Sequence, residues 1–118
     1  MTRFVHLTDL HLSDPAMDDP HLYSDTGAAL DHVVTLIAGL DPAPDFVAIS
    51  GDMTNHGDAE SYRLLKDKLS GIAVPVIHAM GNHDKRGPFR EVFDPDHATD
   101  PEAPLFHHAP FGGLHVIT

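Results

Sequence analysis

The chain has 118 residues, of which 42% are hydrophobic, enough for one small domain with a packed core. With 18 acidic and 7 basic residues its formal net charge is -11, which argues against nucleic acid or an anionic membrane as a partner. It has no cysteine, which excludes disulfides, thiolate metal sites and a cysteine nucleophile. Small phosphorylated substrates stay compatible with this charge, because bound divalent cations reverse its sign locally.

Three short apolar runs, at 4–8, 45–50 and 74–80, predict β-strands, and each run ends in a polar cluster. Their hydrophobicity is nearly continuous, as in parallel strands that are covered on both faces. Between them, apolar residues recur at helical spacing from Leu30 to Leu40 and from Ala59 to Leu69. The order β-α-β-α-β predicts an α/β fold whose right-handed crossovers bring the three polar clusters to one edge of the sheet.

After residue 84 the pattern becomes weaker. A short helix is predicted at 87–93, an irregular loop at 94–104, and a hairpin with arms at 105–108 and 114–118. No apolar run is long enough for a membrane helix or a secretory signal, so we expect a cytoplasmic protein. Because the last predicted strand has no successor, we expect residues 1–118 to be the truncated N-terminal part of a single domain. An open sheet edge favours self-association, such as a homodimer.

The first polar cluster places Asp9 and His11 directly after a strand. The pleat has a period of two, so both side chains point to the same side. A carboxylate and an imidazole together suit Mn, Fe or Zn better than Mg or Ca. Taken alone, the pair also fits a turn-forming aspartate beside a partly buried histidine.

The second cluster follows the second strand, where Gly51 lets the backbone approach a ligand and Asp52 projects its carboxylate. One carboxylate can bridge two cations about 3.5 to 4 Å apart, the spacing used in two-metal hydrolysis. The alternative is a plain turn at the end of a strand. Asn55 and Gly57 are expected to form the loop rather than to bind metal.

The third cluster runs from Gly81 to Asp84 and combines three polar side chains. Asn82 can offer its amide oxygen to a cation, and His83 can donate a proton to a leaving oxygen. Asp84 is expected to orient the far ring nitrogen of His83. Arg86 is either a phosphate contact or a solvated arginine.

Together, Asp-x-His, Gly-Asp and Gly-Asn-His-Asp, in this order, resemble the first three signature blocks of the calcineurin-like metallophosphoesterases. The resemblance covers nearly the whole chain and is strongest to bacterial class III cyclic nucleotide phosphodiesterases. It implies a layered metallophosphoesterase-type fold with sheets flanked by helices. It also implies that Asp9 and His11 bind one metal ion, that Asp52 bridges two, and that a second ion has another ligand. That ligand would be Asn82, and His83 would be the catalytic residue.

The implied function is metal-dependent phosphoric ester hydrolysis, with a dinuclear centre of Mn, Fe or Zn and a metal-bound hydroxide. The leading substrate is a cyclic nucleotide of the 3',5'-cAMP type. An exonuclease or a pyrophosphohydrolase of the same superfamily is an alternative, although the negative charge disfavours nucleic acid. The family completes its site with a further histidine and a Gly-His-x-His block, which this sequence lacks. The other alternative is therefore a metal-binding half-domain, and we expect residues 1–118 alone to be inactive or nearly so.

The remaining histidines do not stand in the family pattern. His6 and His78 lie within apolar runs and are expected to pack in the core. His107 and His108 are expected to be a solvated pair in a loop or an edge strand.

Overall fold

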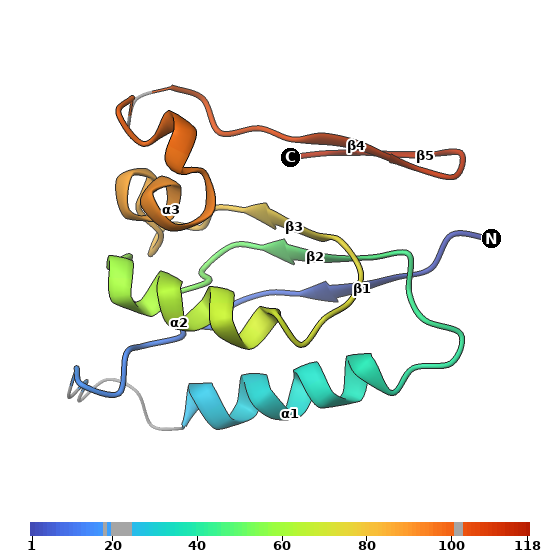
Figure 1. The fold of residues 1–118 in the computed structure, drawn as a ribbon, viewed down its shortest axis with the longest axis horizontal. Coiled ribbons are helices and arrows are strands. Elements are labelled where there is room, and N and C mark those ends of the chain that lie inside the picture. Colours follow the sequence, from blue (N-terminus) through green and yellow to red (C-terminus); the bar gives the residue numbers. More distant parts are fainter. Residues whose placement is uncertain (18, 20–24, 101–102) are drawn as a thin grey trace.

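The computed structural model of the chain describes residues 1–17, 19, 25–100 and 103–118. Its central sheet consists of β1 (Phe4–Leu7), β2 (Phe46–Ser50) and β3 (Val76–Ala79), all parallel, in the order β1-β2-β3. Since the crossovers return each strand in the same direction, the three carboxyl ends meet at one edge of the sheet (Figure 1). The predicted parallel α/β arrangement is confirmed.

Three helices follow the strands: α1 (Thr26–Ala38), α2 (Ala59–Leu69) and α3 (Arg86–Phe93). The first two begin at aspartates whose carboxylates accept a hydrogen bond from a main-chain N–H of the first turn. Asp25 caps α1 and Asp58 caps α2. Within the described ranges, no helix is long and apolar enough to cross a membrane.

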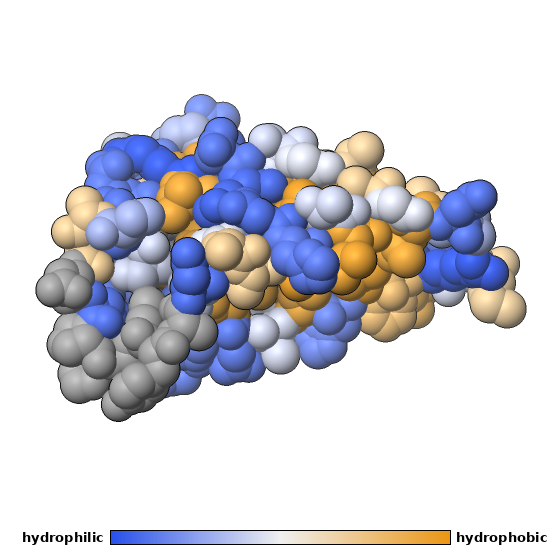
Figure 2. All heavy atoms as spheres, turned by 90° about the horizontal axis from the view of Figure 1, so that it is seen from below, coloured by the Kyte–Doolittle hydropathy of each residue, from blue (hydrophilic) through white to orange (hydrophobic). Residues whose placement is uncertain are grey.

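The core lies between the central sheet and the helices, where α1 packs on α2 and α2 packs on α3 (Figure 1). Its buried side chains come from all three helices, from β2 and from the connecting loops, and include Leu12, Leu30, Ile37, Val47, Ile49, Met53, Leu65, Leu69, Phe89 and Val92. On the face seen from below, apolar side chains lie in a band among hydrophilic ones (Figure 2). Leu36 of α1 and the following Leu40 are among the exposed large apolar residues.

The chain ends in an antiparallel hairpin formed by β4 (His108–Phe111) and β5 (Leu114–Ile117). Two glycines make the turn, and the first of them, Gly112, has a φ of 60°. Because this tight turn sets the pairing, the first arm runs from His108 to Phe111, whereas the sequence predicted it at 105–108. A short 3-10 helix, η1 (Pro95–His97), lies in the stretch predicted to be an irregular loop.

The expectation that all three strands are covered on both faces is wrong for β1. Phe4 is 54% exposed and His6 is also exposed, whereas β2 is mostly buried. His6 is therefore not a core residue, and its Nε2 lies 2.7 Å from Ser50 Oγ. His78 of β3 packs as predicted, against the ring of Phe93 with 4.8 Å between ring centroids.

Candidate metal centre

The polar residues that follow β1 and β2 adopt an unusual backbone conformation. Asp9, His11 and Asp52 have φ angles of 54°, 43° and 49°. The left-handed conformation costs a non-glycine residue about 1 to 2 kcal/mol, and it persists only where surrounding contacts hold it. Here the main chain ties the two loops together. His11 N–H donates to the carbonyl of Asp52 at 2.9 Å, and Asp9 N–H donates to the carbonyl of Gly51 at 3.1 Å.

Three side chains from the three loops converge on one point. One ligand atom each from His11, Asp52 and His83 lies within 4.8 Å of the other two. His11 Nε2 is 3.7 Å from Asp52 Oδ2 and 3.6 Å from Asp9 Oδ1. Two donors bound to one cation at about 2.0 to 2.2 Å lie at comparable separations, so this set fits a borderline divalent cation.

Asp9 lies at the exposed side of this cluster. The hydroxyl of Thr8 donates to Asp9 Oδ2 at 2.6 Å, and this bond, together with the nearby His11, lowers the pKa of the Asp9 carboxyl. The group is therefore ionised at neutral pH, as a cation ligand must be.

Asp52 lies in the loop that follows β2 and is held against the loop that follows β3. The two loops are in contact at glycines. A Cβ added at Gly81 would lie 2.1 Å from Asp52 Oδ1, closer than any two such atoms can approach. Gly51 has a φ of 115° and lies against Gly81, so a Cβ added at Gly51 would be only 2.9 Å from the Cα of Gly81. Asp52 Oδ1 accepts from the main-chain N–H of His83 at 3.0 Å, which leaves Oδ2 facing His11 Nε2.

Asn55 contacts both histidines of the cluster, although the sequence suggested only a loop former. Its side-chain Oδ1 lies 3.1 Å from His11 Nδ1, and its main-chain oxygen lies 2.9 Å from His83 Nδ1. A main-chain oxygen only accepts, so His83 Nδ1 carries a proton, and Nε2 is the ring nitrogen left for a cation or a further proton. The signal available in the sequence was the place of Asn55 in the same loop as Asp52.

Asp84 has a different role from the predicted one. Its carboxylate turns back to accept from the N–H of Gly81 at 2.9 Å and from the N–H groups of Met53 and Thr54 at 3.1 and 3.2 Å. Tyr62 donates its hydroxyl to the same carboxylate at 2.9 Å, and burial raises the pKa of Tyr62 so that the proton stays in place. The orienting partner of the His83 ring is therefore Asn55, and Asp84 joins the two loops to α2.

Two further predicted residues lie beside the cluster. Asn82 is exposed between Gly81 and His83, and its role as a ligand stays a prediction. Arg86, at the start of α3, lines a hollow of about 490 Å³ together with Gly81 and Asp84. Its contact with a substrate phosphate also stays a prediction.

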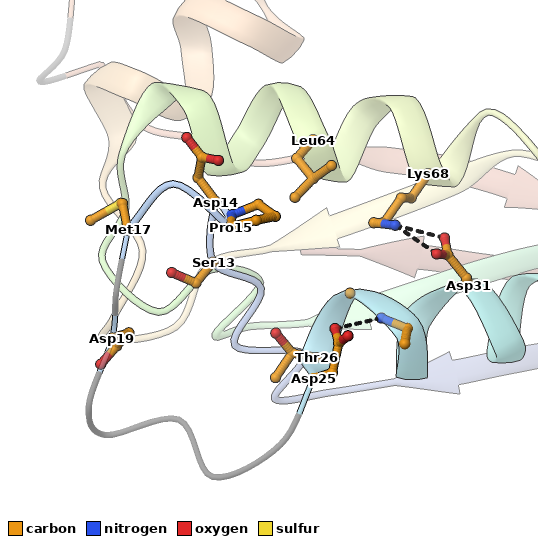
Figure 3. A pocket seen from close by; sticks show the side chains of 12 residues that line it. Ser13, Asp14, Pro15, Met17, Asp19, Asp25, Thr26, Asp31, Leu64 and Lys68 are labelled. Carbon is orange, nitrogen blue, oxygen red and sulfur yellow. Dashed lines mark hydrogen bonds and ion pairs between the residues drawn. The ribbon is translucent and has the colours of Figure 1, made fainter.

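A separate hollow of about 450 Å³ lies between the start of α1 and the loop after β1 (Figure 3). Asp19 forms part of its wall, and at the other end Lys68 pairs with Asp31 at 2.8 Å (Figure 3). The residues that line this hollow do not include His11, Asp52 or His83. The candidate metal centre is therefore a distinct place on the molecule.

Comparison with known proteins finds similarity over nearly all of the chain. The family model described as calcineurin-like phosphoesterase matches residues 2–117. A "Probable cyclic nucleotide phosphodiesterase" of Rhodococcus erythropolis is 35% identical, covering 97% of this chain and 38% of that relative. The 3',5'-cyclic adenosine monophosphate phosphodiesterase CpdA of Pseudomonas aeruginosa is 33% identical over 75% of this chain and 32% of its own length.

A third relative carries a different substrate in its name. The glycerophosphodiester phosphodiesterase GpdQ of Enterobacter lignolyticus is 33% identical over 77% of this chain and 32% of its own length. The chain thus spans about a third of the length of the curated relatives that it matches. Because the family model covers nearly every residue, the resemblance suggested by the sequence is confirmed, and the chain belongs to the calcineurin-like phosphoesterase family.

Proposed function

We propose that this chain serves in the metal-dependent hydrolysis of a phosphodiester, with a 3',5'-cyclic nucleotide such as cAMP as the leading substrate. The observation that carries the proposal is the convergence of His11, Asp52 and His83 at the carboxyl ends of three parallel strands. The names of two relatives support the substrate class. Glycerophosphodiesters are the second candidate, because another relative is named for them.

We assign a role to each proposed ligand. Asp9, His11 and Asp52 would hold one divalent cation of Mn, Fe or Zn, and Asp52 with Asn82 would hold a second. Bound divalent cations polarise phosphoryl oxygens and make a water molecule nucleophilic at neutral pH. Two divalent cations would carry more positive charge than the carboxylates of Asp9 and Asp52 offset, so the site would be locally positive and would attract an anionic substrate to a chain of net charge -11.

His83 is the residue that we propose for proton transfer. The main-chain oxygen of Asn55 accepts from Nδ1–H and Asp52 Oδ1 accepts from the main-chain N–H, so the ring is held in place and Nε2 is left for proton transfer. Protonated at Nε2, this ring would donate its proton to the leaving alkoxide as the phosphorus–oxygen bond breaks. His83 also lies close enough to His11 and Asp52 to bind a cation together with them. An experiment must therefore distinguish proton transfer by His83 from metal binding by His83.

We further propose that residues 1–118 form the N-terminal part of a single metallophosphoesterase domain and turn over little or no substrate alone. The support is that the chain spans about a third of the length of its relatives. A cytoplasmic location and a homodimer stay predictions.

The first experiment measures Mn²⁺ binding to the 118-residue chain by titration calorimetry. Asp52→Asn should weaken the affinity at least about ten-fold, because it removes a charge that faces His11 Nε2. Asp96→Asn is the matched control, since Asp96 is an exposed acid of η1. Equal affinities in the wild type and the Asp52→Asn variant would refute the proposed centre.

The second experiment measures turnover of cAMP and of a glycerophosphodiester by the full product of the native gene. His83→Asn should lower kcat at least about a hundred-fold with Mn²⁺ affinity nearly unchanged if the ring transfers a proton. A parallel loss of Mn²⁺ affinity would instead identify His83 as a ligand. Failure to hydrolyse either substrate would refute the proposed substrate class.

A further inference from the structure

Asp19 lies next to the loop that follows β2, although the two are far apart in the sequence. Its side chain is only 3% exposed. Its Oδ2 is 2.5 Å from Asn55 Nδ2 and 2.6 Å from His56 Nε2. A buried carboxylate with two such partners is strongly held in one orientation.

This contact decides which way the amide of Asn55 faces. A carboxylate only accepts hydrogen bonds, so the amide must turn its NH₂ group to Asp19. Its oxygen is then the atom that lies 3.1 Å from His11 Nδ1. The reversed amide would set its oxygen against the Asp19 carboxylate, at a cost of one hydrogen bond and a repulsion between two acceptors.

The orientation of the amide in turn selects the tautomer of His11. An amide oxygen only accepts, so His11 Nδ1 must carry the proton and Nε2 must present its lone pair. That Nε2 is the atom near the two carboxylates, at 3.6 Å from Asp9 Oδ1 and 3.7 Å from Asp52 Oδ2. With the other tautomer, a proton would occupy the place where a cation must bind.

We propose that Asp19 is a positioning residue of the candidate metal centre, which acts through Asn55 to hold His11 in the tautomer that can bind a cation. This inference rests on the proposed function only for the identity of the ligand, a divalent cation. The relay itself consists of two contacts within the chain, from Asp19 to Asn55 and from Asn55 to His11.

His56 provides a matched control for this relay. It shares Oδ2 of Asp19 with Asn55 and is 42% exposed, and its Nε2 lies 3.5 Å from Asn55 Nδ2, at the limit of hydrogen-bond distance. His56→Ala therefore removes one partner of Asp19 and leaves the bond between Asp19 and Asn55 intact. Asp19→Asn removes the group that orients the amide, because a neutral amide at position 19 can either donate or accept.

The experiment reads the tautomer of each histidine from two-bond ¹H–¹⁵N correlation spectra of the cation-free chain at about pH 8. Wild type and His56→Ala should show His11 in the Nδ1–H form. Asp19→Asn should show a substantial fraction in the Nε2–H form. In a separate Mn²⁺ titration, Asp19→Asn should bind about ten-fold more weakly and His56→Ala within about two-fold of wild type.

A double variant tests the direction of the relay. Asp19→Asn combined with Asn55→Asp exchanges the carboxylate and the amide, so the residue at position 55 can again only accept from His11 Nδ1. The Nδ1–H form should return in this variant, which also preserves the net charge. Melting curves of all variants check that each is folded, and the double variant tests the relay even if Asp19→Asn is unstable.

Three results would overturn the proposal. They are an unchanged His11 tautomer in Asp19→Asn, an equal shift in His56→Ala, and no recovery in the double variant. The proposed function fails separately, because a wild-type chain that binds no Mn²⁺ would refute the metal centre whatever tautomer the spectra show.

Discussion

The histidines of the strand-end loops and those of the β4–β5 hairpin carry the same chemical group in opposite settings. In the loops, Nδ1 of His11 and Nδ1 of His83 each face an oxygen of Asn55. In the hairpin, His108 and His115 are exposed and stack on each other, with 5.1 Å between ring centroids. Oxygens that only accept therefore orient the loop imidazoles, whereas His108 Nε2 in the hairpin lies 2.8 Å from His115 Nδ1, a ring nitrogen that can either donate or accept.

The backbones of the two regions differ in the same sense. The loops hold three non-glycine residues at positive φ and bring Gly81 against Asp52. The hairpin has its positive φ at Gly112, and Gly113 has open space around it. Glycine thus permits close contact between chain segments in the loops and only a tight turn in the hairpin.

The largest expected effect comes from adding a methyl group to each region. Gly81→Ala should destabilise the chain by about 3 kcal/mol, because its Cβ would overlap Asp52 Oδ1 and the main-chain nitrogen of the same residue. Gly113→Ala has room for its Cβ and should change stability by less than about 0.5 kcal/mol. Urea unfolding measures both. Similar losses in the two variants would mean that the loop contact is not tighter than the hairpin turn.

The next largest effect is expected at Asp84, and it tests whether this carboxylate holds together the loops that follow β2 and β3. Asp84→Asn replaces a carboxylate that accepts from three main-chain N–H groups and Tyr62, and should cost about 2 kcal/mol. Asp96→Asn, at an exposed position of η1, should cost less than about 0.5 kcal/mol. Urea unfolding again measures the difference. If Asp84→Asn is as stable as the control, the carboxylate does not hold the loops.

The third effect uses pH, because the ring of His78 packs against Phe89 and Phe93 of α3. Burial, with a smaller contribution from His107, lowers the pKa of His78 from 6.5 to about 4. Within the described part of the chain its Nε2 is buried without a hydrogen-bond partner. As the pH falls below 6.5, the unfolded chain binds a proton that the folded chain does not. Stability is therefore lost between pH 6.5 and pH 4.

His78→Leu should remove this dependence. Between pH 7 and pH 5 the wild type should lose about 1.5 kcal/mol more stability than the variant does, as measured by urea unfolding at both values. If the variant loses as much stability as the wild type between these two pH values, the pKa of His78 is not lowered in the folded chain.

The smallest effect is expected in the hairpin. Replacing both His108 and His115 by alanine should change the free energy of unfolding by less than about 0.5 kcal/mol, because both rings are exposed. The same variant should bind Mn²⁺ as the wild type does, whereas His11→Ala should bind at least about ten-fold more weakly. A loss of Mn²⁺ affinity in the hairpin variant would place a metal site there and overturn the comparison.

Much of the fold could be predicted because its signals are local. Apolar runs ending in polar clusters identified the three strands, and helical spacing identified the helices between them. Parallel crossovers then required the clusters to meet at one edge, as they do. The first arm of the hairpin lies later in the chain than predicted, because its register depends on the turn at Gly112. The exposure of β1 depends on which elements cover the sheet, and the residues of a strand do not specify that.

The sequence by itself determined which residue types stand at the strand ends, and therefore where Asp9, His11, Asp52 and His83 gather. Only the tertiary structure decided how these side chains are held. Asp84 turns back to main-chain N–H groups, and Asn55 receives its orientation from Asp19. These contacts join loops that are distant in the chain, and a hydrogen bond depends on position and direction, which no local pattern encodes.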